Sequence, residues 1–301
     1  MGEEVTGDLT TTLNRNALRL ATRIYRATPF RTVREAYFRS FLRLVRGRRV
    51  IRTVEGMTFE LDLGELIDVG VFLQQYERDV VGVIERLARP GWTVLDIGAN
   101  IGAHALRFSR MVGAGGRVFA FEPMEFAFAK LARNVSLNDA GNTRTFRIAL
   151  SDRNLPGQRV AFRSSWATSG ERRAESSVAD FQTLDDWCAA NAVTDVHLIK
   201  LDVDGHELQV VRGGLQTIER CRPVLLIEAG AWHFASRDRN PWQLLASRGY
   251  RFWETGTLAE TDLEAVRRRL PDRDDEMGFS VNLVAAVEPL RLREGGEGAR
   301  R

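Results

Sequence analysis

Residues 94–102 read Val-Leu-Asp-Ile-Gly-Ala-Asn-Ile-Gly, and this stretch decides the fold. An apolar run stops at Asp96 and opens into a glycine-containing turn before an amphipathic segment, which is typical of a buried strand that feeds a helix. Gly98 and Gly102 remove side chains that would keep a ligand away from the backbone. The following predicted strand ends at Glu122, where an acid is placed to accept both hydroxyls of a ribose. Together these residues predict a pocket for an adenosine-bearing cofactor, with Asp96 offering a carboxylate at its edge.

The same loop indicates which cofactor fits. A dinucleotide fold usually needs Gly-x-Gly-x-x-Gly, because the second glycine lets the backbone touch a pyrophosphate. Asn100 occupies that second position here, and a side chain there disfavours a pyrophosphate but suits a ligand that carries an amino acid and a sulfonium. The resulting pattern, Asp-x-Gly-x-x-x-Gly, resembles the first motif of class I methyltransferases, which use S-adenosylmethionine (SAM). A nicotinamide-dependent oxidoreductase on a related sheet is the alternative that Asn100 disfavours.

Further motifs follow in a fixed order along the chain. They are Gly56-Met-Thr-Phe-Glu-Leu-Asp62, Tyr76-Glu77, Pro90-Gly91, Phe121-Glu122-Pro123, Ala149-Leu-Ser-Asp152, Thr183-Leu-Asp185, Ile199-Lys-Leu-Asp-Val-Asp-Gly-His-Glu207 and residues 223–228. This order and spacing resemble the FkbM-type methyltransferase family over residues 50–287. The resemblance implies a SAM-dependent O-methyltransferase that acts on hydroxyls of natural products or of surface sugars. One departure is Asp204, a shorter acid that stands where the family usually has glutamate.

Alternating strand and helix periods predict an α/β fold of the Rossmann-like, class I methyltransferase type. The expected strands are 93–97, 117–121, 144–149, 196–202, 223–228, 250–254 and 279–286; the expected helices are 103–112, 125–138, 183–191, 205–218, 240–248 and 260–269. We therefore expect seven strands in a mostly parallel sheet, the last of them antiparallel, with helices on both faces.

The segments outside this alternation define the expected domain organisation. A hairpin at 50–63 and a helix at 69–88 precede the sheet. The polar residues 152–177, with a short extra strand near 160–163, are expected to form a mobile lip of the substrate site. We expect a basic helical extension at 1–49, a methyltransferase domain at 50–290 and a disordered tail at 291–301.

Chemistry is expected at the carboxyl ends of the central strands. Because SAM carries an activated methyl group, the protein needs to align the acceptor oxygen and help it lose a proton. His206 is the first candidate for this base, since an unperturbed histidine pKa of about 6.5 leaves it mostly neutral at pH 7; helix capping is its alternative role. Asp202 is expected to contact the SAM amino group or the acceptor, or to cap the following helix. Glu228 at the next strand end completes the predicted catalytic set.

The acids Asp202, Asp204 and Glu228 also leave a metal alternative open. Hard oxygen ligands at adjacent strand ends suit Mg²⁺, and a bound cation would lower the pKa of the acceptor hydroxyl without a histidine base. Three acids are equally expected in a site that binds a cation-bearing cofactor. Mg²⁺ is therefore an alternative that we do not favour.

Other residues are assigned by resemblance or by position. The family resemblance implies that Tyr76 and Glu77 lie near the cofactor, with helix packing as the alternative for the tyrosine. Asp152 is placed to receive the adenine amino group, or to act as a turn residue. His233 and Trp232 are expected to line the acceptor site, with a loop histidine of no role as the alternative.

Four more side chains are given structural roles. Cys188 and Cys221 fall in a predicted helix and at a predicted strand start, so we expect neither a disulfide nor a four-ligand zinc site. His104 and His197 are expected to serve packing or to lie at the surface.

Charge is unevenly distributed along the chain, whose formal net charge is only +3. Twelve arginines against the single acid Glu35 lie within residues 15–52, interleaved with apolar residues at spacings that predict two basic amphipathic helices broken at Pro29. Such helices either pack on the catalytic domain or lie on an anionic membrane through residues 13–52; nucleic-acid binding is not expected. A SAM-binding protein of the membrane surface that lacks catalysis is a further alternative, against which the acids Asp202 and Glu228 argue.

Targeting signals are not evident in the sequence. No apolar run approaches the roughly 20 residues that span a bilayer, and the acidic, polar start differs from a signal peptide. We therefore expect a cytoplasmic enzyme, peripheral to the inner face of the membrane if the basic helices bind there, with a small-molecule or glycan hydroxyl as acceptor.

Overall fold

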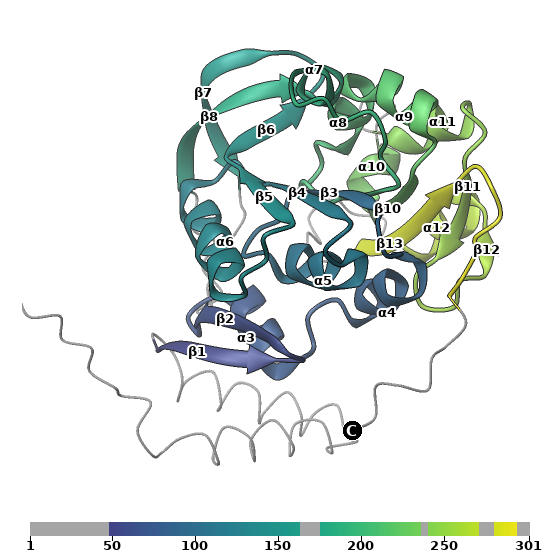
Figure 1. The fold of residues 1–301 in the computed structure, drawn as a ribbon. Coiled ribbons are helices and arrows are strands. Elements are labelled where there is room, and N and C mark those ends of the chain that lie inside the picture. The colour runs from purple at the N-terminus through teal and green to yellow at the C-terminus, as the bar shows by residue number, and fades with distance from the viewer. Residues whose placement is uncertain (1–47, 163–174, 236–239, 271–279, 294–301) are drawn as a thin grey trace, which may run out of the picture. The chain divides into compact units, whose positions relative to one another are not determined.

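The computed structural model describes residues 48–162, 175–235, 240–270 and 280–293 (Figure 1). They belong to two compact units, one formed by residues 1–76 and 165–173 and the other by residues 77–164 and 174–301. Most of the basic N-terminal segment and of the C-terminal tail lies outside the described residues, as does the middle of the expected lip. In the part of the chain that is described, no helix is long and apolar enough to cross a bilayer.

The first unit contains a hairpin and a short helix. Strands β1 (Arg49–Val54) and β2 (Met57–Asp62) pair antiparallel, with Val54 opposite Met57. The turn residues Glu55 and Gly56 both have positive φ, 50° and 79°, as a tight two-residue hairpin turn requires. The hairpin predicted around this dipeptide is confirmed.

The single helix predicted over residues 69–88 is wrong. The structure has α3 (Leu66–Leu73) in the first unit and α4 (Arg78–Leu87) in the second. The helices are separated because Gln74 and Glu77 adopt left-handed backbone conformations, with φ of 58° and 38°. Helical periodicity continues across this break, so the periodicity alone does not reveal it.

The second unit is built on a large sheet whose strands lie in the order β12-β11-β13-β10-β9-β3-β4-β5 (Figure 1). The strands are β3 (Thr93–Ile97), β4 (Arg117–Phe121), β5 (Thr143–Phe146), β9 (Leu198–Leu201), β10 (Val224–Gly230), β11 (Arg251–Glu254), β12 (Glu260–Thr261) and β13 (Ser280–Ala286). The chain runs from β3 outward to β5 and then returns to β9 on the other side of β3. This reversal marks the switch point, at the carboxyl ends of β3 and β9, where open α/β sheets bind their ligands.

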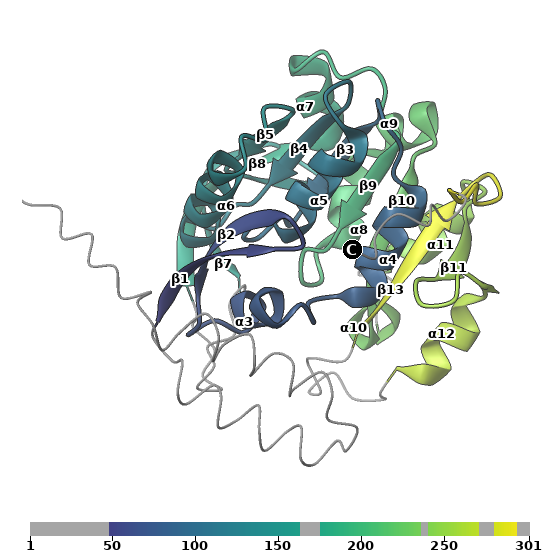
Figure 2. The ribbon, with the colours of Figure 1, turned by 60° about the horizontal axis from the view of Figure 1, so that its bottom comes forward.

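Antiparallel pairing is confined to one edge of this sheet. β13 lies antiparallel between β10 and β11 (Figure 2), as the predicted last strand requires. The neighbours β10, β9, β3, β4 and β5 all pair in parallel. The predicted mostly parallel, Rossmann-like sheet is confirmed, with the two-residue β12 as an added edge strand that shortens the helix predicted at 260–269 to α12 (Leu263–Arg269).

Helices cover both faces of the sheet, as the sequence predicts. Apolar residues of α4, α5 (Ala103–Val112) and α6 (Glu125–Leu137) pack on one face. On the opposite face lie α7 (Leu184–Ala190), α8 (Glu207–Gly213), α9 (Leu215–Cys221), α11 (Pro241–Ala246) and α12. Burial on both sides explains why β3 and β9 read as almost continuous apolar runs.

A second, smaller sheet contains the end of the expected third strand and part of the expected lip of the substrate site. The strand predicted at 144–149 is divided into β5 and β6 (Ile148–Ser151), and β6 joins β8 (Glu175–Thr183) and β7 (Leu155–Phe162) in the order β6-β8-β7. The extra strand expected near 160–163 corresponds to β7, which begins earlier, at Leu155. The helix predicted over 205–218 is likewise two helices, α8 and α9, because Gly213 approaches the backbone of Ser151 so closely that a Cβ atom would lie 1.8 Å from its carbonyl oxygen.

Aromatic side chains pack around Trp187 in the hydrophobic core. Its ring lies edge-on to those of Phe119, Phe121 and Phe146, at centroid distances of 5.1, 4.7 and 5.0 Å. Replacing Trp187 by alanine leaves a cavity in a fully packed region, so we expect it to lower the free energy of unfolding by about 3–5 kcal/mol. Urea denaturation followed by circular dichroism measures this loss. Trp187→Phe should lose roughly half as much, and equal losses for the two variants would contradict the packing argument.

Candidate active site

The loop after β3 is shaped by three residues with positive φ. These are Gly98, Asn100 and Gly102, with φ of 81°, 47° and 87°. A Cβ atom on Gly98 would lie 1.8 Å from the backbone oxygen of Asp202, so only glycine permits the approach of the chain that leaves β9. A Cβ atom on Gly102 would lie 2.8 Å from the side chain of Leu131. The loop predicted to cradle a ligand therefore packs directly against the chain that carries Asp202.

Glu122 lies immediately after β4 and is almost completely buried. One carboxylate oxygen accepts the N–H of Asn100 and the other accepts the N–H of Met124, each at 2.9 Å. Burial raises the pKa of Glu122 to about 7, in spite of these two hydrogen bonds. Since each carboxylate oxygen has a second lone pair, Glu122 retains the capacity to accept further hydrogen bonds from a ligand.

A buried ammonium lies among carboxylates at the end of β9. Lys200 is 2% exposed, and its Nζ lies 3.0 Å from Oδ2 of Asp202. Asp96 is paired with Lys200 in the register of β3 and β9 and has no exposed surface. Burial acts to lower the pKa of Lys200, but Asp202, Asp96 and Glu77 outweigh it and raise that pKa. Lys200 therefore carries a positive charge throughout the physiological pH range.

Asp96 differs from the expectation of an acid open to ligand. Neither of its carboxylate oxygens has a hydrogen-bond partner among the described residues. Burial raises the pKa of Asp96, although Lys200 and His104 act to lower it. Asp96 is therefore buried beside Lys200 and does not lie at the surface, where a ligand would contact it.

Glu77 belongs to this charged cluster, and the proximity to the cofactor that the resemblance implies for it stays a prediction. Its Oε2 lies 2.6 Å from Nε2 of His104. Burial acts to raise the pKa of Glu77, but the hydrogen bond and charge of His104 outweigh it, so the pKa is lowered. His104, expected to serve packing or to lie at the surface, is buried and bonded to a site residue. Tyr76 belongs to the first unit, and its predicted proximity to the cofactor stays a prediction.

Glu207 fixes the turn that follows Asp202. Its Oε1 accepts the N–H groups of Val203 at 2.9 Å and Gly205 at 3.3 Å, and its Oε2 lies 2.6 Å from Nε2 of His233. His233 in turn accepts the N–H of Gly230 at Nδ1, which leaves its proton on Nε2 as the donor to Glu207. Burial acts to raise the pKa of Glu207, but these hydrogen bonds outweigh it and the pKa is lowered.

Glu228 lies near the end of β10 and is held by one hydrogen bond. Ser280 donates to its Oε1 at 2.5 Å, while its Oε2 is buried without a partner in the described part of the chain. Burial, followed by the charges of Asp202 and Glu207, raises the pKa of Glu228 well above its usual value, and Asp204 contributes in the same direction. Asp202 and Asp204 are therefore near enough to Glu228 to influence its ionisation.

The possible Mg²⁺ site at Asp202, Asp204 and Glu228 stays a prediction. Among the residues described, no three His, Cys, Asp or Glu side chains are grouped closely enough to hold a metal ion. Asp202 instead pairs with Lys200, and Glu228 accepts from Ser280.

His206 and Asp152 lie beside the smaller sheet. Nε2 of His206 is 2.9 Å from Oγ of Ser151, and its ring lies edge-on to Phe181 at 6.1 Å. Burial lowers the pKa of His206, against the effects of Glu207 and Asp152. Asp152 itself pairs with Arg153 at 3.0 Å, and this hydrogen bond lowers its pKa. The predicted base is therefore neutral at pH 7, but it faces Ser151 and Asp152 rather than the acids at the ends of β9 and β10.

The two residues expected to line the acceptor site have different surroundings. His233 has no exposed surface, so the prediction that it lines the acceptor site is wrong. Its Nε2 instead donates a hydrogen bond to the buried Glu207. Trp232 is partly exposed and lies against Gly205 and Gly230, where Cβ atoms would approach its ring within 3.4 and 2.3 Å. Its buried Nε1 has no hydrogen-bond partner among the described residues. Trp232 therefore borders the turn that follows Asp202, and its expected place in the acceptor site stays a prediction.

With this geometry established, sequence comparison decides the family. Residues 96–252 match the Methyltransferase FkbM domain. The chain belongs to this family. The resemblance inferred from the motifs is thereby confirmed, and with it the assignment of the sheet to the methyltransferase type.

Individual FkbM relatives cover only part of the chain. It is similar to the 2-O-methyltransferase NoeI of Sinorhizobium fredii, with 31% identity over 46% of this chain and 64% of that protein. It is similar to the hexuronic acid methyltransferase AglP of Haloferax volcanii, with 29% identity over 51% and 63%, respectively. The chain thus spans less than two thirds of the length of either relative. A crystal structure of Methyltransferase FkbM from Methylobacillus flagellatus has 18% identity and a TM-score of 0.41, covering 73% of this chain and 52% of that one.

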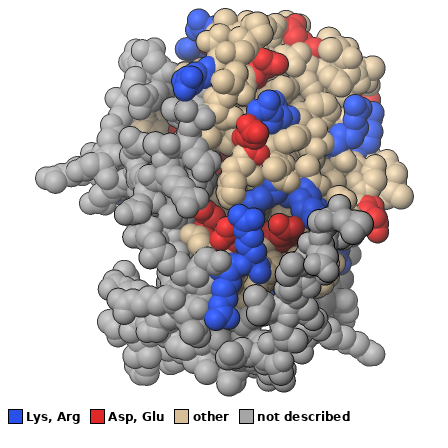
Figure 3. All heavy atoms as spheres, turned by 90° about the vertical axis from the view of Figure 1, so that its left-hand side faces the viewer, with Lys and Arg blue, Asp and Glu red and all other residues tan. Residues whose placement is uncertain are grey.

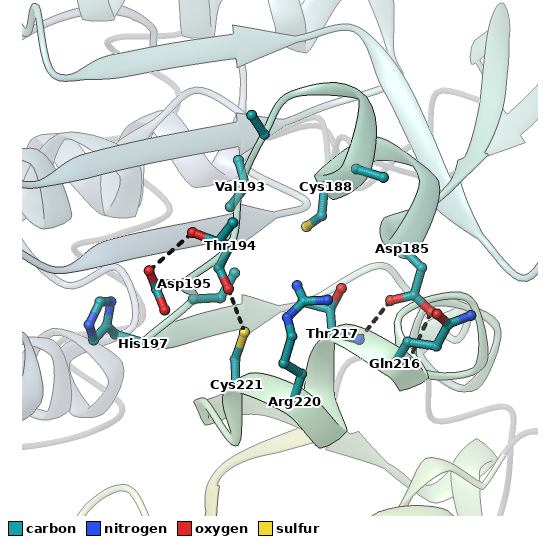
Figure 4. Close-up of a pocket in the computed structure, with 13 residues that line it drawn as sticks. Asp185, Cys188, Val193, Thr194, Asp195, His197, Gln216, Thr217, Arg220 and Cys221 are labelled. Carbon is teal, nitrogen blue, oxygen red and sulfur yellow. Dashed lines mark hydrogen bonds between the residues drawn. The ribbon is translucent and has the colours of Figure 1, made fainter.

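A cavity of about 660 Å³ lies away from these acids (Figure 4). Residues of α7, α9 and the segment before β9 line it, including Cys188, Cys221 and Arg220. His197, just before β9, places it at the amino end of that strand, whereas Asp202 follows the carboxyl end. Both thiols are free, and burial raises the pKa of Cys188 to about 11, so the expected absence of a disulfide agrees with the structure.

Three site residues of this FkbM domain were missed in the sequence. Lys200 lies inside an apolar strand, where its rarity in an arginine-rich chain was the available signal. Glu207 was quoted in the acidic motif but given no role, and His104 was assigned to packing. Nothing in local spacing indicates that His104 reaches Glu77 or that Glu207 reaches His233, because both pairs join elements far apart in the sequence.

The raised pKa of Glu122 gives a pH-dependent test. An acid whose pKa is higher in the folded than in the unfolded state loses stability as pH rises between the two values, here from 4.5 to about 7. Glu122→Gln removes this loss, so its stability relative to wild type should improve by up to about 3 kcal/mol across that interval, at about 1.36 kcal/mol per pKa unit. The amide also disturbs one backbone hydrogen bond, but that penalty is independent of pH. Denaturant titrations at both ends of the interval measure the change, and a constant difference would contradict the assignment.

Proposed function

We propose that the protein is a SAM-dependent O-methyltransferase whose acceptor is a hydroxyl of a sugar, glycan or natural product. Membership of the FkbM family supports methyl transfer. The names of the two relatives, a 2-O-methyltransferase and a hexuronic acid methyltransferase, favour a sugar acceptor. The observation that carries the proposal is the arrangement of Glu122, Asp202 and Glu228 at neighbouring strand ends around a glycine-containing loop. Such a site lies where open α/β sheets bind their ligands.

The residues present fit SAM, which supplies an activated methyl group on a sulfonium when bound. Glu122 is held by two backbone N–H groups and has lone pairs left for the ribose hydroxyls. Asp202 is 20% exposed at its side chain and is the acid placed to meet the ammonium group. The acids of the site outnumber Lys200, and a ligand that bears two positive groups would favour their ionised form.

Glu228 is the residue that we favour as proton acceptor. Its raised pKa makes it a stronger base than an ordinary carboxylate, and its Oε2 is not used by another described group. Efficient proton transfer requires a pKa closer to the working pH than that of an ordinary carboxylate, and burial among other acids shifts the pKa of Glu228 in that direction. His206 is neutral but is held by Ser151, so we assign it to positioning the start of α8 rather than to proton transfer. Trp232 borders the same turn and offers an apolar ring and an N–H donor to the acceptor.

Calorimetry with S-adenosylhomocysteine tests the proposal. The folded wild type should release or absorb heat on binding, and Glu122→Ala should weaken the affinity about tenfold or more, since it removes the ribose acceptor. Methyl incorporation from labelled SAM into a panel of hexoses and uronic acids then identifies the acceptor. A folded wild type that shows no interaction would end the methyltransferase proposal.

If Glu228 is the proton acceptor, replacing it should lower kcat without weakening cofactor binding. Glu228→Gln should lower kcat by about 100-fold or more, the usual contribution of a general base, while the affinity for S-adenosylhomocysteine stays within about twofold of wild type. His206→Gln should retain most of kcat. Stopped-time assays at saturating SAM compare the two variants, and a larger loss in the histidine variant would transfer the role to His206.

We further propose that residues 13–52 bring the protein to an anionic membrane surface. Support comes from twelve arginines against one acid between residues 15 and 52. Each basic residue near an anionic surface contributes about 1 kcal/mol, so replacing Arg15, Arg19, Arg23 and Arg26 by glutamine in the full chain should weaken vesicle binding by about 100-fold or more. Sedimentation with vesicles of phosphatidylserine and phosphatidylcholine measures it. Equal sedimentation of both proteins would remove the proposal.

A further inference from the structure

The chain uses lysine almost nowhere. Of its 43 basic residues, 41 are arginine and two are lysine, Lys130 and Lys200. Lys130 lies on α6, with its Nζ 5.2 Å from the ring centroid of Phe126. Lys200 lies at the centre of the large sheet and is almost completely buried. A sequence that otherwise chooses arginine keeps one of its two lysines at the most enclosed basic position described.

The surroundings of Lys200 explain a requirement for lysine. Its strand neighbours in register are Leu226 on β10 and Asp96 on β3, and both are buried. A lysine ammonium is a compact point charge at the end of a flexible stem, whereas a guanidinium is planar and presents donors in a rigid fork. The compact group suits an interior position in which Asp202, just after β9, accepts its hydrogen bond and Asp96 lies in register on β3.

The charges that act on Lys200 come from three elements: Asp202 after β9, Asp96 on β3 and Glu77 before α4. His104 on α5 acts on Asp96, and Glu207 on α8 acts on Asp202, while β10 contributes the apolar Leu226. Glu77 is compensated by His104, and Glu207 by His233 and two backbone N–H groups. Among the described residues, Asp202 accepts a side-chain hydrogen bond from Lys200, and Asp96 accepts none.

We propose that Lys200 is a positioning residue for cofactor binding: its buried ammonium, bonded to Asp202 and next to Asp96 in register, orients the Asp202 carboxylate and opposes the protonation of both acids, so that the site meets a cationic ligand with a fixed carboxylate. This inference rests on the proposed function and adds a residue to it. Lys200 does not touch the ligand in this scheme; Asp202 does. Without the ammonium, the two acids lie in an interior that favours their protonated form, and the negative charge offered to a sulfonium and an ammonium is lost.

Three substitutions in the full-length protein test the inference. Lys200→Met keeps the length of the side chain and removes its charge, Lys200→Arg keeps the charge and changes the shape, and Lys130→Arg is the matched control at the other lysine. Calorimetry with S-adenosylhomocysteine should show affinity within about twofold of wild type for Lys130→Arg and about tenfold or more weaker for Lys200→Met, as one pKa unit in a binding acid implies. Lys200→Arg should fall between them.

The pH dependence of binding separates positioning from a merely structural role. Since the carboxyl groups of the Lys200→Met variant need a higher pH to ionise, its affinity should recover in part between about pH 6 and about pH 8. The affinity of wild type should change less over that interval. Equal affinity and equal pH profiles for Lys200→Met and wild type would overturn the inference while leaving the methyltransferase proposal intact.

A measurement on the unliganded protein keeps the inference testable if no ligand binds. Thermal melts should show that the loss of Tm in Lys200→Met grows as pH rises from about 5 to about 8, because the unpaired acids resist ionisation in the folded state only. The Tm loss of Lys130→Arg should be small and constant. A Tm loss in Lys200→Met that does not vary with pH would overturn the role of Lys200, whereas absent binding by wild type with the expected Tm pattern would reject the function alone.

Discussion

The hydrogen bonds of one buried carboxylate, Glu207, hold the candidate site together. Its two oxygens take the N–H groups of Val203 and Gly205 and the Nε2–H of His233, whose other nitrogen accepts from Gly230. Burying a charge is costly unless donors replace the lost water, and three donors do so here. Because Gly230 ends β10 and Val203 follows β9, this chain of bonds couples two neighbouring strand ends. The positions of Asp202 and Glu228 depend on it.

The other buried carboxylates of the candidate site, unlike Glu207, are not saturated with hydrogen-bond donors. Asp96 has no hydrogen-bond donor in the described part of the chain, and Glu228 uses only one of its oxygens. Burial raises the pKa of Asp96, Glu122 and Glu228, whereas the saturated Glu207 has a lowered pKa. Acids left with unused acceptor capacity are costly to the fold and are typical of sites that bind ligands or move protons. The contrast separates a supporting acid from acids available for function.

Sequence reasoning succeeded where the signal is local. Apolar runs ended by acids placed β3 and β4, and with them Asp96 and Glu122, because strand period and strand-end position are properties of a few consecutive residues. It failed where distant elements meet. Nothing near Lys200 reveals that Asp96 is its neighbour, which is a consequence of strand order. The helix break at Gln74 also escaped prediction, since a non-glycine residue with positive φ carries no glycine or proline marker.

Asn100 determines both the conformation of the loop after β3 and its contact with Glu122. Its φ of 47° is a conformation that asparagine tolerates better than most residues with a Cβ atom. In that conformation its N–H points to Glu122, so the turn after β3 and the acid after β4 are held in one arrangement by a 2.9 Å hydrogen bond. Glycine would permit the same turn but would also open the loop to a pyrophosphate. A side chain at this position therefore preserves the contact to Glu122, the acid proposed to bind the ribose, and disfavours a pyrophosphate, which is the combination that the proposed cofactor requires.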